Sequence, residues 1–337
     1  MSKRLSIVLA VAVLLAVFVS GPAFADWPTR PINIIVYSSA GGSTDLSNRA
    51  IAEAIKPYLG VDVVVSNMPG AMGATATAYV WEAPHDGYLW YGTSEGFLGL
   101  ACQGMHHTTV DDWEFFMIGG TPGVVSVRPD SPYETFQDVL DDVAARPGDV
   151  TIATSIPGCI WHIQYLTLER YGGYELAYIP YAGSHPSIVA ALAGEIDVVW
   201  TGVGEQSEFL RAGELRPLAM YDTVPHKFAG VTIPPITDYV PELEQVMPLI
   251  QFVGFALPAD TPPEILDTIA EAFEQAMQEE PVEQFADTVA SNLYGYMGDE
   301  AKELAYNQQE IFAWLLWEQG IGTVSPEEFG IANPFED

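Results

Sequence analysis

The sequence predicts an α/β protein with two lobes joined by two crossing strands. Apolar, strand-like runs alternate with helix-like runs, an order typical of parallel strands connected by crossover helices. This alternation occurs twice, over residues 32–91 and again over residues 150–220. The chain then returns to one strand-like run and to helical patterns, over residues 252–319. The order therefore indicates a first lobe, a second lobe and a return into the first.

The first block begins with the apolar run at residues 32–36, which predicts a buried strand. A turn at Gly41-Gly42 follows, and apolar residues then recur at helical spacing. Ser43 or Thr44 is the expected N-cap of this helix. The rest of the block predicts a strand, an alanine-rich helix and a third strand, at residues 61–66, 72–82 and 88–91.

The second block repeats this order around other turns. Its four expected strands are short apolar runs at residues 150–154, 176–179, 196–200 and 216–220. Its two expected helices occupy residues 161–170 and the stretch from the Gly183 turn through residue 192.

The segments that follow differ in composition. Residues 225–241 are proline-rich and are expected to be irregular, because proline removes a backbone donor. An apolar run at 252–257 predicts a strand, and a helical pattern begins at Pro262. Interruptions of this pattern are expected near Pro281 and at residues 295–298.

The chain is expected to cross between the lobes near residues 124–128 and 249–255. The expected first lobe comprises residues 26–126 plus 250–337, and the expected second lobe comprises residues 127–249. Two lobes joined by two strands form a cleft that can close on a ligand.

The N-terminus has the pattern of a secretory signal peptide, expected over residues 1–25. Lys3 and Arg4 precede an apolar core, and Ala23-Phe24-Ala25 forms a small-x-small cleavage site. The alternative is an uncleaved membrane anchor, which the short apolar core disfavours. We expect cleavage after Ala25 and export to the periplasm.

The formal net charge of the chain is −33. Nucleic-acid binding is disfavoured because it needs clustered lysine and arginine, and attachment to an anionic membrane is disfavoured for the same reason. The long-range field would repel an anionic ligand, so short-range hydrogen bonds would have to hold any anion.

Three glycine-bearing turns follow strand-like runs and lead into helix-like runs, at residues 40–45, 68–73 and 181–186. Such a turn directs free backbone N–H groups and the positive end of a helix at one point, which suits an anion. Repeated from several elements, the arrangement indicates a cleft that captures a carboxylate rather than a reactive centre.

Three side-chain pairs could suggest other chemistry. Ser184-His185 and Cys159 with His162 could pair a nucleophile with a base, and His106-His107 with Asp111-Asp112 could bind a metal. Neighbouring residues seldom converge in the way these sites require. We therefore expect no enzyme activity, no metal and no cofactor.

Cys102 and Cys159 are the two cysteines of the chain. In an oxidising compartment they could form a disulfide, or both could be buried free thiols. The sequence leaves both alternatives open, because it does not give the distance between their Cα atoms.

Several motifs occur in the order and spacing of a known family. They are an opening at Trp27-Pro28, a Gly-Gly-x-x-Asp loop, an Asn-x-Pro-Gly-Ala-x-Gly turn and a Tyr-x-Gly-Ser turn, at residues 27–32, 36–45, 67–73 and 179–184. On these motifs the chain resembles the substrate-binding proteins of tripartite tricarboxylate transporters, the Bug-type extracytoplasmic solute receptors. The resemblance extends over nearly all of the expected mature chain.

This resemblance implies a two-lobe, type II periplasmic-binding-protein fold, often called a Venus flytrap. It implies a monomer that captures a small organic carboxylate and delivers it to a membrane permease. A ligand sensor for a membrane kinase is the alternative, with a secreted enzyme on the same scaffold as a weaker one.

The resemblance also places the ligand in loops of both lobes. The first-lobe candidates lie in the loops after the first and third strands: Tyr37, Ala40, Gly41, Gly42, Ser43, Thr44, Asp45, Thr93 and Ser94. The second-lobe candidates lie in or beside the corresponding loops: Thr154, Ser155, Trp161, Tyr181, Gly183, Ser184 and Trp200. For Asp45 a structural role at the helix start is favoured, and for Trp161 and Trp200 core packing remains an alternative.

Departures from the family pattern concern mainly the second lobe. Tyr37 replaces a proline, and apolar residues at 156–161 and 201–203 replace stretches that are commonly more polar. We therefore expect a ligand with an apolar or aromatic body.

Overall fold

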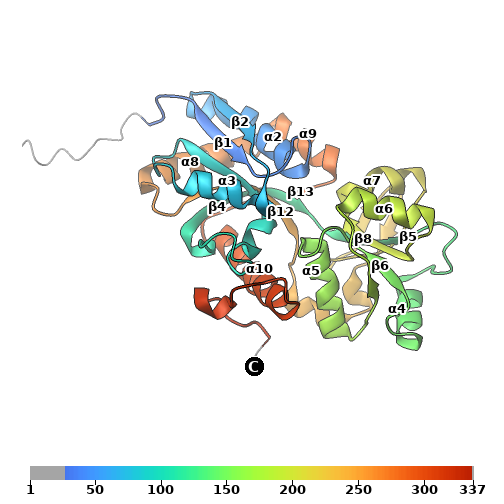
Figure 1. The fold of residues 1–337 in the computed structure, drawn as a ribbon. Helices are drawn as coiled ribbons and strands as arrows, with labels where there is room; N and C mark the ends of the chain where they lie inside the picture. Colours follow the sequence, from blue (N-terminus) through green and yellow to red (C-terminus); the bar gives the residue numbers. More distant parts are fainter. Residues whose placement is uncertain (1–26, 336–337) are drawn as a thin grey trace, which may run out of the picture.

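The computed structural model describes residues 27–335. The expected signal peptide lies outside this range. The described chain forms two α/β lobes, and each lobe has its own sheet flanked by helices (Figure 1). This is the two-lobe fold that the sequence predicts.

The first lobe contains a six-stranded sheet with the order β13-β4-β12-β3-β1-β2. Its strands are β1 (Ile32–Val36), β2 (Val63–Asn67), β3 (Leu89–Ser94), β4 (Trp113–Thr121), β12 (Gln251–Pro258) and β13 (Asn292–Met297). β1 pairs in parallel with β2 and β3, whereas β12 is antiparallel to β3 and β4. The parallel half places the ends of β1 and β3 at one edge of the sheet.

Five α-helices belong to this lobe: α2 (Ser43–Leu59), α3 (Ala74–Trp81), α8 (Pro263–Ala276), α9 (Glu280–Val289) and α10 (Gly298–Glu318). α2 packs against α8 and α9 on one side of the sheet. Their shared core contains Phe255, whose ring stacks between Trp90 and Phe116 at centroid distances of 4.4 and 4.8 Å. α10 packs against β4 on a second core.

The second lobe contains a five-stranded sheet with the order β7-β6-β8-β5-β9. Its strands are β5 (Gly123–Val127), β6 (Thr151–Ala153), β7 (Ala177–Tyr178), β8 (Val198–Gly202) and β9 (Arg216–Met220). Its helices are α4 (Phe136–Ala145), α5 (Ile160–Thr167), α6 (Ser184–Ala193) and α7 (Val203–Ala212). A hairpin of β10 (His226–Phe228) and β11 (Val231–Ile233) adjoins it.

Short helical turns complete the chain. They are η1 (Ala71–Gly73), η2 (Glu95–Gly99), η3 (Val110–Asp112), η4 (Leu168–Gly172), η5 (Ile236–Asp238), η6 (Pro241–Val246) and η7 (Pro326–Phe329). η2 directly follows β3 and begins at Glu95.

The chain passes from the first sheet to the second at Pro122, between β4 and β5. It returns between η6 and β12, which begins at Gln251. The first crossing precedes the expected residues 124–128, because β5 pairs along its length with β8 and β9. The expected lobe boundary at 126 therefore falls within a strand of the second sheet.

Several elements differ from the sequence prediction. β4 and the helices α4 and α7 were not predicted, and the segment expected to be irregular contains the β10–β11 hairpin. The interruption predicted at 295–298 is largely the strand β13. Gly295, at φ 67°, lies where the register of β13 against β4 shifts, and this bulge breaks the alternation typical of a strand.

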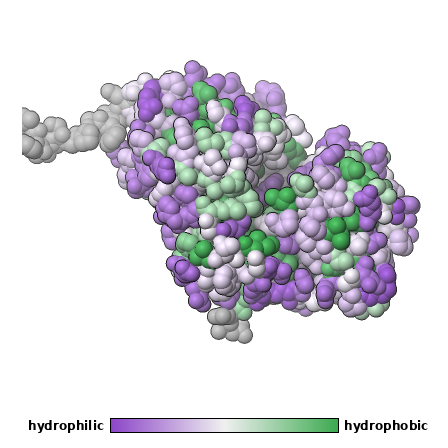
Figure 2. All heavy atoms as spheres, in the orientation of Figure 1, coloured by the Kyte–Doolittle hydropathy of each residue, from purple (hydrophilic) through white to green (hydrophobic). Residues whose placement is uncertain are grey.

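The lobes also contact each other near their base. α10 packs against α5, and one hydrophobic core continues from the first lobe into the second. Above this base the surface is hollowed between the two lobes (Figure 2). Among residues 27–335 we find no helix with the length and apolar character needed to cross a membrane.

Candidate functional site between the lobes

Loops at the ends of β1 and β3 form the first-lobe side of the site. Tyr37 follows β1, and its hydroxyl lies 2.5 Å from the Ser94 hydroxyl at the end of β3. The pKa of Tyr37 is raised, mainly by burial, so its hydroxyl remains a neutral hydrogen-bonding group. Thr44 also reaches Tyr37, and Thr93 is buried beside Ser94. The structure thus brings together four predicted residues.

Asp45 organises the loop that leads into α2. Its carboxylate accepts hydrogen bonds from the Gly41 N–H at 2.8 Å and the Asn67 amide at 2.8 Å, and it pairs with Arg49 at 2.9 Å. Burial opposes its ionisation, yet these hydrogen bonds hold its pKa below the usual value. Asp45 is 1% exposed, so it shapes the loop from within, in agreement with the structural role favoured from the sequence.

Ala40, Gly41 and Gly42 lie exposed in this loop, and Ser43 begins α2. Gly42 is the N-cap and has no side chain to satisfy the first backbone N–H groups of the helix. These N–H groups and the positive end of the helix dipole are therefore free for an anion.

Three helices of the second lobe begin on its side of the site. α5, α6 and α7 begin after Cys159, Gly183 and Gly202, and none of these three residues caps its helix with a side chain. The carboxylate of Glu205 accepts the Gly202 N–H at 2.9 Å. Ser184 and Trp161 lie close enough to favour its ionised form, although desolvation raises the pKa of Glu205, so the starts of α5, α6 and α7 meet near this carboxylate.

The remaining second-lobe candidates differ in exposure. Thr154 and Ser155 are buried at the end of β6, whereas Tyr181 is half-buried. Trp161 is 2% exposed and packs against Gly202, behind Glu205. Trp200 is fully buried and its indole donates to Gln164 at 3.0 Å. Trp200 therefore belongs to the interior of the lobe rather than to the cleft surface, because its side of β8 faces the core.

Two acids at the site were not predicted. Glu95 follows Ser94 directly and is 6% exposed, and its Oε2 atom has no hydrogen-bond partner. Burial, with a smaller contribution from repulsion by Glu205, raises the pKa of Glu95 to about 8. Each acid lies within two or three residues of a loop that the sequence singled out, and that proximity was the available signal.

The side-chain pairs with possible reactive roles are otherwise engaged. The His162 Nδ1 atom accepts the Gly158 N–H at 3.0 Å, and burial lowers the pKa of His162 to about 4. His106 bonds to Thr108. Within residues 27–335 no group of three or more His, Cys, Asp or Glu side chains gathers as a metal site would require.

The two cysteines are free thiols. Burial raises the pKa of Cys102 and of Cys159 to about 12, so both remain protonated at neutral pH. The sequence leaves open a disulfide or free thiols, and the structure contains free thiols.

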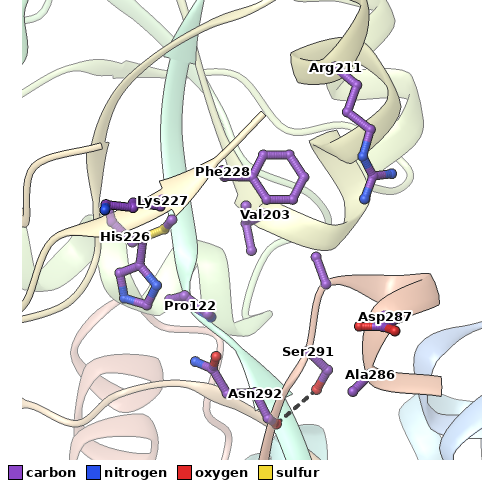
Figure 3. A pocket seen from close by; sticks show the side chains of 12 residues that line it. Pro122, Val203, Arg211, His226, Lys227, Phe228, Ala286, Asp287, Ser291 and Asn292 are labelled. Atoms are coloured by element: carbon purple, nitrogen blue, oxygen red, sulfur yellow. Dashed lines mark hydrogen bonds between the residues drawn. The ribbon is translucent and has the colours of Figure 1, made fainter. Parts of the chain in front are cut away.

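A separate cavity of about 310 Å³ lies between the second lobe and the α9–β13 segment of the first (Figure 3). Arg211 and Phe228 line one side, and Ser291 and Asn292 line the other. A neighbouring cavity of about 460 Å³ contains Tyr294 and other residues near the crossing. Neither cavity includes a predicted ligand residue.

Two α/β sheets joined by two crossings, with loops and helix starts of each lobe on the sides of the site, define a two-lobe solute-binding protein. The family model of the tripartite tricarboxylate transporter family receptor matches residues 47–311. The chain belongs to this family.

Relatives and solved structures agree with this assignment. Protein BugT of Bordetella pertussis is 31% identical over 60% of the chain and 64% of BugT, so the match spans less than two thirds of that relative. A TctC solute-binding protein from Polaromonas superposes with a TM-score of 0.75 at 25% identity, covering 87% of this chain and 100% of that one. An R. palustris protein solved with adipate has a TM-score of 0.66 at 23% identity, covering 91% and 99% of the two chains.

Gly183→Val is expected to abolish ligand binding while leaving the fold largely intact. Gly183 has φ 158° and ψ 169°, a region that essentially only glycine adopts, whereas a Cβ atom would meet only Pro186, at 3.8 Å. The cost is therefore a changed loop rather than a clash in the core. Titration calorimetry with an acid that binds the unaltered protein would measure the loss.

Gly213→Val is the matched control, because Gly213 also has a positive φ, of 69°, at the far end of α7. Its expected effect is a lower melting temperature with unchanged affinity. Unchanged affinity in Gly183→Val would instead remove Gly183 from the site.

Proposed function

We propose that this protein is a periplasmic receptor that captures a small organic carboxylate between its lobes and delivers it to a tripartite tricarboxylate-type permease. The observation that carries the proposal is the exposed glycine turn at the start of α2, whose free N–H groups face no capping side chain. The family assignment and the adipate reported for one structural neighbour support the carboxylate.

The first-lobe loop supplies the main contacts for the carboxylate. The backbone N–H groups of Gly42, Ser43 and Thr44 hold its oxygens, and the Ser94 hydroxyl adds a neutral donor close by. Ser184 begins α6 on the opposite lobe, where its hydroxyl lies beside Glu205. Such donors work at short range, which suits a chain whose net charge of −33 repels anions at a distance.

Ligand capture requires the lobes to approach each other around the two crossings. A ligand that contacts both lobes binds the closed form more tightly, so it shifts the population toward closure. The permease then recognises the closed receptor. The ligand provides differential contacts and undergoes no covalent change.

A thermal-shift screen of the mature protein tests this function. We expect one class among mono-, di- and tricarboxylates and aromatic acids to raise the melting temperature clearly. A ligand at a hundred times its dissociation constant adds about 2.7 kcal/mol to the free energy of unfolding. A folded, ligand-free sample that responds to no acid would contradict the proposal.

A further inference from the structure

The second-lobe side of the site already contains a carboxylate. Glu205 accepts the N–H of Gly202 at the start of α7 and lies beside Ser184 at the start of α6. These are donors of the kind that an anionic ligand would use. Glu205 is exposed as a residue, but desolvation of its carboxyl group raises the pKa of Glu205, and this group lies where a ligand carboxylate would otherwise fit.

The first lobe contributes a second carboxylate at the same place. Glu95 interacts electrostatically with Glu205 and with Cys159, both in the second lobe, so its carboxyl group faces across the cleft. It is 94% buried, as its exposed fraction is 6%, and its Oε2 atom has no partner. A buried, unpartnered acceptor costs free energy, which a matching donor on a ligand would recover.

We propose that the ligand carries a cationic nitrogen, such as an ammonium group, bound between Glu95 and Glu205, in addition to a carboxylate held by the start of α2. This inference rests on the proposed receptor function and specifies the ligand class of the same site. The ligand is thus an amino acid or another zwitterion rather than a simple dicarboxylate.

Charge and hydrogen bonding both favour this ligand. A carboxylate placed between the two glutamates would oppose the ionisation of both, whereas an ammonium group offers three donors to their oxygens. An ammonium group also lowers the net negative charge of an acid, so the field of a strongly acidic protein repels it less. In the empty site Glu95 holds a proton near neutral pH, and the bound cation displaces it.

Matched ligand pairs test the inference. Titration calorimetry at pH 8, with EDTA present, compares butyrate with 4-aminobutyrate, succinate with aspartate, and adipate with 2-aminoadipate. In at least one pair we expect the amino member to bind tenfold or more tightly than its partner. Glu95→Gln and Glu205→Gln should each reduce that preference tenfold or more.

Glu208→Gln is the control, because Glu208 lies on α7 but is exposed and pairs with Arg211 at 3.2 Å. It should change neither affinity nor preference. Circular dichroism of each variant checks that loss of binding does not reflect loss of fold.

Three results would overturn the inference. One is that the amine-free acids bind as tightly as the amino acids or more tightly, and that Glu95→Gln keeps this affinity because glutamine also donates a hydrogen bond to a carboxylate. The receptor function would then stand without the ammonium site. Another is binding that appears only when calcium replaces EDTA, which would assign the acids to a metal ion. Absence of binding by every acid of both kinds would contradict the receptor function itself.

Discussion

Glu95→Gln is expected to stabilise the ligand-free protein, and to stabilise it more at pH 8 than at pH 5. The pKa of Glu95 is raised from 4.5 to about 8 in the folded state, mainly by burial. Between these values the folded state binds more protons than the unfolded state, so stability falls as pH rises. Glutamine removes this loss, which amounts to about 1 kcal/mol at pH 5 and about 3 kcal/mol at pH 7.

Urea denaturation of both proteins at pH 5, 7 and 8 measures the difference in the free energy of unfolding. Glu208→Gln, on an exposed part of α7, should show no such pH dependence. Equal stability of Glu95→Gln and the unaltered protein at pH 8 would show that Glu95 is not destabilising when ionised. A stabilising substitution that removes binding is the pattern expected of a site residue.

Asp45→Ala is expected to lower both stability and ligand affinity. The substitution leaves the Gly41 N–H and the Asn67 amide without their acceptor and removes the ion pair with Arg49. Because the pair is buried only on the Asp45 side, we expect a loss of about 2–3 kcal/mol. The loop before α2 should lose its fixed shape, and affinity for a bound acid should fall at least tenfold.

The sign of the pH dependence is opposite to that for Glu95. The pKa of Asp45 is lowered in the folded state, so its stabilisation is present above the usual aspartate pKa and is lost as pH falls. The difference between Asp45→Ala and the unaltered protein should therefore shrink in acid. Glu53→Ala, which breaks the exposed pair with Lys56, is the matched control and should cost less than about 0.5 kcal/mol. A loss of less than about 0.5 kcal/mol in the free energy of unfolding of Asp45→Ala would contradict the organising role of Asp45.

The fold was predictable where local chemistry determines an element. The run at 32–36 and the glycine turn before α2 specify a strand and a helix start by themselves, and the structure has both. β13 was not predictable in the same way. Its strand conformation depends on pairing with β4, and Gly295 disrupts the local pattern.

The site was predictable in part for the same reason. Glycine turns are visible in the sequence because they need particular backbone conformations. The role of Glu95 and Glu205 depends on the two lobes facing each other. No sequence pattern links acids so far apart in the chain. Trp200 shows the converse, because a residue beside a cleft loop can still have its side chain in the core.

The most direct test of the account is a crystal structure of the mature protein with the acid that gives the largest thermal shift. We predict that its carboxylate lies against the backbone of Gly41–Thr44. An amino group, if the acid carries one, should lie between Glu95 and Glu205. A ligand bound instead in the cavity beside Tyr294, or with no contact to the start of α2, would contradict the proposed capture site.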